Sequence, residues 1–304
     1  MGRGADDPLR QGRRLRPGHG PGPPRVKPRG SHALAPQPLE RTIRTAVVLY
    51  VLLLVALPLA ALTHVSLQGG FAAFWAHVRE PISWASLKLT LWTGALVAVL
   101  NTLFGTLTAW VLVRYRLPGR GLLSALVDLP LAIPTLVAGV MLAVLYGPES
   151  MVGSSLEVLG VQVVFARPGI ILALLFVTFP FVVRAVEPLL DEVDPAEEEA
   201  ALVLGAGPWR TFRTVFLPVL LPPALSGGIR SLGRALGEFG SVVVVAGNIP
   251  MKTLTAPVYI YGEIESGAPR SGAAVSVVLL ALALSLHVAA RAVERRTGAR
   301  HAQD

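Results

Sequence analysis

The stretch from Asp194 to Pro218, DPAEEEAALVLGAGPWRTFRTVFLP, is the longest strongly polar interruption between two apolar blocks in the second half of the chain. Asp194 and Pro195 are typical of a helix start, and Glu197 stands in capping-box position. Gly205 suits the residue that follows a helix. A second short amphipathic helix then leads to Pro218. The stretch therefore predicts two short helices joined by a glycine corner, which is more ordered than a simple tether.

A fixed pattern within this stretch resembles the EAA signature of ABC-type importer permeases. Glu199, Ala200 and Ala201 are followed after three residues by Gly205, and after nine more by Val-Phe-Leu-Pro, where Ile is usual at the first of these four positions. The alternative is a solvated helix that happens to carry glutamates. The resemblance implies a cytoplasmic coupling helix that docks on a separate ATPase subunit. The coupling residues that it implies are Glu199, Ala200, Ala201, Gly205, Leu217 and Pro218.

The rest of the chain is strongly apolar. It has 304 residues, of which 53% are hydrophobic and 15% are charged, whereas a soluble domain has about 25% charged residues. Each of six apolar blocks approaches or exceeds the roughly 20 residues that span a bilayer. We therefore expect an all-α, polytopic membrane protein with six transmembrane helices, and the resemblance implies the type I ABC importer permease architecture over residues 45–296. The blocks are approximately 45–67, 86–113, 122–146, 168–190, 219–246 and 272–292.

The basic residues predict the orientation of these spans. Ten of the 27 Lys and Arg residues lie in residues 1–44, an arm rich in Arg, Pro and Gly that is predicted to be disordered. This arm either contacts anionic membrane lipid or is a solvated tail; we expect no nucleic-acid partner. The loops on one side of the spans are far more basic than those on the other. By the positive-inside rule, both termini, the 297–304 tail and the 194–218 loop are cytoplasmic in a multi-pass protein of the cell membrane.

The fifth apolar block carries charges that a membrane span normally turns toward protein or water. Arg230, Arg234 and Glu238 are spaced for one helical face, and Gly233 and Gly237 form a GxxxG pair that favours close approach of another helix. Two interpretations remain open. The arginines hold a positive potential along an anion path, or Arg234 and Glu238 form an ion pair that locks the bundle.

The segment RALGEFGSVVVVAGNIP, from Arg234 to Pro250, resembles oxyanion permeases. Ser241 follows the EFG triplet as in the T-type subunit of the sulfate/thiosulfate family, where molybdate permeases typically have Ala-Thr. Pro134 interrupts the third block, and such breaks either line a path or are ordinary kinks. The candidates for the translocation path are Arg230, Arg234, Glu238, Ser241 and Pro134. The resemblance implies three partners: ABC ATPase subunits, a second, related W-type permease and a sulfate/thiosulfate-binding protein.

Two rival functions are considered. One is a molybdate/tungstate ABC permease, and the other is a membrane-embedded enzyme that uses Glu238 or Ser241 with a histidine. His287 lies within a predicted span, and no acid is near it in the sequence. The chain contains no GxxxxGK[ST] motif and no cysteine, and its six histidines show no ligand spacing. We therefore expect no metal, no cofactor and an ATP-hydrolysing partner rather than an enzyme.

Overall fold

The computed structural model describes the backbone of residues 38–301 and the side chains of residues 42–293. Most of the predicted basic arm lies outside the described residues. Helix α1 begins at Pro38, before the predicted boundary at residue 45, and α14 continues to His301, beyond the boundary at 297. The chain forms two compact units, Met1–Val55 and Ala56–Asp304.

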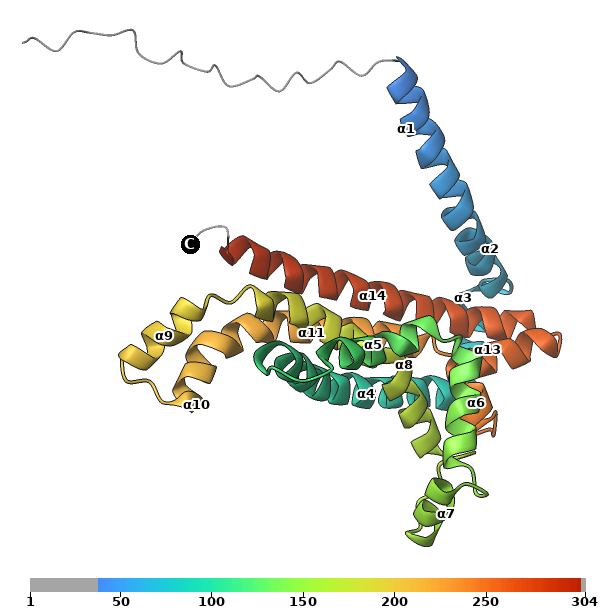
Figure 1. Cartoon of the computed structure of the whole chain (residues 1–304). Helices are drawn as coiled ribbons and strands as arrows, with labels where there is room; N and C mark the ends of the chain where they lie inside the picture. Colours follow the sequence, from blue (N-terminus) through green and yellow to red (C-terminus); the bar gives the residue numbers. More distant parts are fainter. Residues whose placement is uncertain (1–37, 302–304) are drawn as a thin grey trace, which may run out of the picture. The chain divides into compact units, whose positions relative to one another are not determined.

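The described part of the chain consists of helices (Figure 1). Two short segments, η1 and η2, are π-helical. The elements are α1 (Pro38–Val51), η1 (Leu52–Ala56), α2 (Leu57–Ser66), α3 (Gly70–Arg79), α4 (Pro81–Arg114), α5 (Arg120–Ala132), α6 (Thr135–Tyr146), α7 (Met151–Val158), α8 (Arg167–Asp191), α9 (Pro195–Val203), α10 (Pro208–Thr211), η2 (Phe212–Phe216), α11 (Leu217–Leu236), α12 (Gly240–Ala246), α13 (Ala256–Glu265) and α14 (Pro269–His301).

Five helices in the described residues are long and apolar enough to cross a membrane, and a bent pair makes a sixth candidate. The five are Thr42–Ser66, Pro81–Arg114, Arg167–Asp191, Pro208–Leu236 and Pro269–Val293. The third predicted block is the bent pair: α5 and α6 meet at 112°. Ile133 is extended because it precedes Pro134, and this ends α5. The predicted interruption of the third block at Pro134 is therefore confirmed, as a bend between two helices.

The fifth predicted block also differs at both of its ends. The chain is helical from Pro208 through Leu236, so the second short helix of the predicted corner runs directly into the span. Pro218 is accommodated because the wider π turn of η2 precedes it, and such a turn relieves the clash of a proline with the carbonyl four residues earlier. At the other end, α11 stops at Leu236 and the block resumes as α12.

Helix α8 packs most extensively against α4 and α11, and α14 packs along α11 (Figure 1). Glycines allow α8 to approach both of these neighbours closely: a Cβ on Gly105 of α4 would lie 2.8 Å from the Cβ of Val182 in α8, and one on Gly227 of α11 would lie 2.9 Å from the Cα of Val182. The predicted close approach at Gly233 is wrong, since an added Cβ there would meet none of the described atoms within 4 Å.

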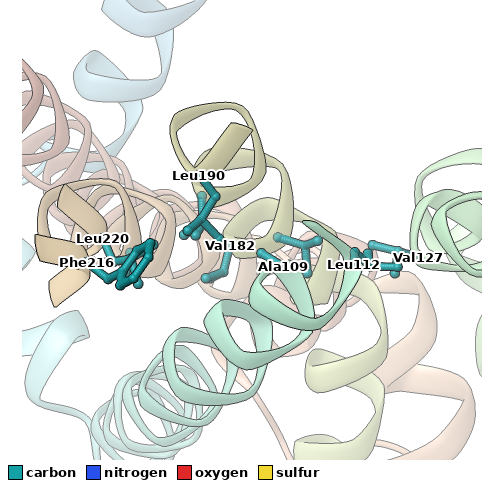
Figure 2. Packing of buried hydrophobic residues seen from close by; sticks show 10 residues of the cluster. Ala109, Leu112, Val127, Val182, Leu190, Phe216 and Leu220 are labelled. Carbon is teal, nitrogen blue, oxygen red and sulfur yellow. The ribbon is translucent and has the colours of Figure 1, made fainter. Parts of the chain in front are cut away.

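Buried apolar side chains form three clusters along the second unit. One lies between α4, α5, α8 and the start of α11 (Figure 2), and includes Val182, Leu190 and Phe216. Another joins α3, α4, α13 and α14, where the Ser83 hydroxyl donates to the Tyr259 oxygen at 2.7 Å. Burial raises the pKa of Tyr259 above its ordinary value, so this phenol stays neutral at physiological pH. The bundle is thus held together at both ends.

Candidate functional site

Helix α9 and the turn that follows it form a well-capped corner between α8 and α10. The Asp194 carboxylate accepts a hydrogen bond from the Ala196 amide at 2.9 Å. Gly205 has a φ of 78°, and its amide and the next one donate to the carbonyls of Leu202 and Ala201 at 2.9 and 3.0 Å. This pair of bonds is a Schellman motif, which satisfies the last carbonyls of a helix. The predicted helix–glycine–helix corner is confirmed.

The residues of the EAA pattern lie mainly on the surface of this corner. Glu199, Ala200, Gly205, Leu217 and Pro218 are exposed, and Ala201 is half-buried. The corner also carries an apolar surface, which we call the corner surface. It consists of Leu202, Val203, Leu204 and Trp209, with exposed fractions of 53, 87, 85 and 72%. Leu202, Val203 and Leu204 are outside the candidate spans, so lipid does not explain their exposure, and such surfaces are typical of partner binding.

Arg114, at the end of α4, connects the corner to the bundle. Its guanidinium forms an ion pair with the Glu198 carboxylate of α9. The guanidinium carbon also lies 4.7 Å from the ring centroid of Phe216 and 5.7 Å from that of Trp110. Trp110 in turn packs edge-on against Phe212 and Phe216, with centroids 5.5 and 4.8 Å apart. We call Trp110, Arg114, Phe212 and Phe216 the aromatic anchor.

The sequence interpretation missed the aromatic anchor, because it treats the basic residues beside the spans only as charges that orient them. The available signal was the Trp110–Arg114 pair at i and i+4 at the end of an apolar block. Trp209, Phe212 and Phe216 all belong to the second, amphipathic part of the predicted corner. The structure shows Phe216 buried and Trp209 exposed, so only some of these aromatic rings pack inward.

Glu238 lies buried in the break between α11 and α12. One carboxylate oxygen accepts from the Ser241 amide and hydroxyl at 3.0 and 2.9 Å, and the other is 2.7 Å from an Arg234 nitrogen. Its side chain is 1% exposed, against 35% for Arg234. Since α11 ends at Leu236, the predicted continuous face through Arg230, Arg234 and Glu238 is wrong. Arg230 is exposed on α11, while the other two form the i, i+4 ion pair.

The break before α12 lies beside the break at Pro134. A Cβ on Gly139 of α6 would stand 2.9 Å from the Cα of Ser241, and one on Gly240 would stand 3.0 Å from the Leu136 nitrogen. The two helices that restart after the breaks therefore pack with their first turns in contact. Pro134 itself is exposed. The structure thus brings four of the five path candidates into one region and leaves Arg230 further along α11.

A second charged contact was not predicted, although its residues lie in apolar blocks. Arg184 of α8 grips Asp128 of α5 with two nitrogens, at 2.7 and 2.6 Å, and donates to the carbonyl and hydroxyl oxygens of Ser124 at 2.8 Å. It also pairs with Glu187. An arginine in the fourth block opposite an aspartate in the third was the signal, because charges within spans normally find partners. This charge clamp ties α5 to α8.

Long apolar helices, two adjoining broken spans with a buried ion pair between them and an anchored corner outside the spans define a helical membrane transport component. The sequence matches the family described as binding-protein-dependent transport system inner membrane component over residues 101–299, and the chain belongs to this family. The matched region includes the corner, the aromatic anchor and both breaks. The predicted recognition and the permease fold are confirmed.

Similar proteins carry more specific names. The chain is 44% identical over 243 residues to the probable sulfate transport system permease protein cysT of Nephroselmis olivacea, covering 79% of this chain and 86% of that protein. It is 40% identical over 252 residues to the sulfate transport system permease protein CysT of Escherichia coli, covering 83% and 91%. A chain in the crystal structure of a bacterial alginate ABC transporter with its alginate-bound periplasmic protein superposes with a TM-score of 0.71 at 19% identity, covering 85% and 94%.

Proposed function

We propose that this chain is the permease subunit of an ABC importer that moves sulfate or thiosulfate into the cell. The supporting observation is its similarity to sulfate transport system permeases, at about 40% identity, over most of their length. Sulfate is a strongly hydrated dianion that cannot cross hydrocarbon unaided, so a path lined by protein donors is required. A periplasmic or surface binding protein delivers the anion, and a second, related permease of the W type completes the path.

The corner surface is the proposed docking site for the ATPase subunit on the cytoplasmic side. Glu199, Ala200 and Gly205 contact that subunit, and the exposed apolar side chains of the corner are covered by it. Movement then enters the bundle along two routes. One passes through Arg114 to α4. The other passes through η2 into α11, which extends to the break at Glu238. Both termini are cytoplasmic in this orientation.

The region of the two breaks is the proposed gate of the translocation path. Broken helices line paths because their freed backbone groups face protein or water. Arg234, Ser241 and the chain at Pro134 surround Glu238 there, and Arg230 extends the positive potential along α11. The ion pair between Arg234 and Glu238 keeps the break closed until the helices on either side of it move.

Labelled sulfate uptake tests this function. Cells that lack their own sulfate importer are compared with and without this chain and its partner subunits, and excess thiosulfate, molybdate or tungstate is added as a competitor. We expect uptake that depends on the chain and is reduced by thiosulfate. Uptake that is blocked by trace molybdate but is indifferent to thiosulfate would show a molybdate/tungstate permease instead.

A further inference from the structure

A small cavity with a cationic wall lies at the end of α8 that is remote from the corner. It has a volume of about 370 Å³ and is lined by residues of α4, by the first residue of α8 and by the loop before α13. Arg167 begins α8 and Asp191 ends it, so about 36 Å of helix separates this cavity from the corner. The lining residues are Ala85, Lys88, Leu89, Trp92, Arg167, Met251 and Leu254.

Two cations from different helices face this cavity. Lys88 comes from α4 and Arg167 from α8, and a third cation, Lys252, is adjacent because its carbonyl accepts from the Arg167 side chain at 3.3 Å. Among residues 42–293, whose side chains the structure places, no carboxylate lies within ion-pair distance of Lys88 or Arg167. Both side chains are exposed, so their charges are open to solvent ions or to an anion that enters the cavity.

The position of Arg167 is unfavourable for the helix that it begins. A cation in the first turn of a helix is destabilised by the positive end of the helix dipole. This side of the spans is predicted to be the less basic one. Of its five Lys and Arg residues, three are at or beside the cavity, and only two lie elsewhere: Arg79 and Arg270. The cavity is open to the surroundings, since Trp92 and Met251 are 54 and 61% exposed, whereas Leu89 and Leu254 are half-buried.

We propose that this cavity is an oxyanion site, at which a doubly charged tetrahedral anion is received before it enters the path between the helices. The site rests on the proposed function and adds a place and two residues to it. Lys88 and Arg167 together match the charge of a dianion, and the volume holds a partly hydrated one, because each water takes about 30 Å³. The phosphate of a lipid headgroup shares this chemistry, so the experiment must separate the two.

The test measures retention of labelled sulfate by the purified importer complex, without its binding protein, in lipid-free detergent. The variants are Lys88→Gln, Arg167→Gln and both together. Arg79→Gln is the matched control, because each of the two cations lies over a tryptophan ring. The Arg79 guanidinium carbon is 5.6 Å from the Trp75 ring centroid, and the Lys88 Nζ is 5.8 Å from the Trp84 ring centroid. Unlike Lys88, Arg79 does not line the cavity. We expect about fivefold weaker sulfate binding for each single variant, at least tenfold for the double variant and an unchanged control.

Sulfate binding that is the same in the double variant overturns the proposal, as does an unmodified complex that transports sulfate but retains none. Native mass spectrometry of the complex tests for a bound lipid. If an anionic phospholipid is lost only in the double variant, and added sulfate does not displace it, the cavity binds a lipid headgroup. The proposed function has its own readout, which is uptake by cells. If the complex retains molybdate but not sulfate, and the double variant loses this retention, the cavity is an oxyanion site but the transported anion is not sulfate.

Discussion

Arg114 illustrates how much a single side chain contributes to the connection between the corner and the spans. It lies at the end of α4 and contacts both Glu198 of α9 and Phe216 of η2. An ion pair that is partly exposed contributes about 0.5–1 kcal/mol, and a cation–π contact adds a similar amount. Neither contact is strong alone. Together they hold α9 in one orientation, which the proposed docking of an ATPase subunit requires.

Arg114→Ala should therefore reduce transport by about fivefold or more without preventing membrane insertion. Arg114→Lys keeps the charge but loses the planar group that packs on the rings, so it should recover part of the activity. Labelled uptake and the amount of chain in the membrane are the measurements. Arg116→Ala is the control, because Arg116 is two residues away and exposed. Equal losses for Arg114→Ala and Arg116→Ala would contradict the role of the aromatic anchor.

The ion pair at the second break predicts unequal effects for its two partners. Arg234→Ala leaves the almost fully buried Glu238 carboxylate without its cation, which should destabilise the protein by about 3 kcal/mol. Glu238→Gln leaves a neutral amide beside Ser241 and an arginine that reaches solvent, so the loss should be smaller. Thermal unfolding of the purified complex measures both. A lower Tm for Glu238→Gln than for Arg234→Ala would contradict this arrangement.

At the scale of elements, the corner depends on one left-handed residue. Gly205 and Gly207 lie in the same turn, and an added Cβ would meet none of the described atoms within 4 Å at either, but only Gly205 has a positive φ. Gly205→Val should therefore disrupt the corner by about 1–2 kcal/mol or more, whereas Gly205→Asn should be better tolerated. Gly207→Ala is the control. Coupling is read as ATPase activity stimulated by the loaded binding protein, and equal loss in Gly207→Ala would rule out backbone conformation as the cause.

The charge clamp predicts that α5 depends on α8 for its position. Asp128→Ala leaves Arg184 without its two-nitrogen partner, so the contact between these helices should loosen and transport should fall severalfold. Asp191→Asn is the comparison. The Asp191 carboxylate oxygen lies 3.8 Å from an Arg120 nitrogen, and Asp191 is more exposed than Asp128. Protease sensitivity of the loop between α4 and α5 gives a structural readout. It should rise in Asp128→Ala and stay unchanged in Asp191→Asn.

The sequence predicted elements best where local chemistry is decisive. Asp194 and Gly205 locate the ends of α9 because capping depends on few residues. The sequence interpretation was wrong at Pro218, which was expected to end the second short helix. A π turn precedes this proline, and the helix continues through it. The end of α11 at Leu236 was also missed. The break is accompanied there by the buried contacts of Glu238, which the sequence alone does not reveal.

At the scale of the whole molecule, the predicted orientation is open to a direct test because the chain has no cysteine. Val203 on α9 and Val158 on α7 are both 87% exposed and lie at separate ends of the second unit (Figure 1). In intact cells, an impermeant maleimide should label Val158→Cys and leave Val203→Cys unlabelled until the membrane is opened. Labelling of Val203→Cys from outside would contradict a cytoplasmic corner.

Five of the six predicted blocks overlap long apolar helices of the described residues and the third is a bent pair, since apolar length identifies such segments. What the sequence does not reveal is which helices touch. Val182 lies against Gly105 and Gly227, which come from two other helices. The GxxxG pair that drew attention in the sequence has open space beside Gly233. Spacing shows that a close approach is possible, whereas the actual contact depends on the rotation of each helix in the bundle.

The π turn at η2 has a consequence for the phase of the helix that links the corner to the spans. One extra residue rotates the helix before the π turn by about 100° around its axis relative to the helix after the turn. Phe212, Arg213 and Thr214 of this turn lie among the nine residues between Gly205 and the closing Val-Phe-Leu-Pro. Deleting one of these three would keep both motifs intact yet rotate the corner surface by about 100° relative to α11.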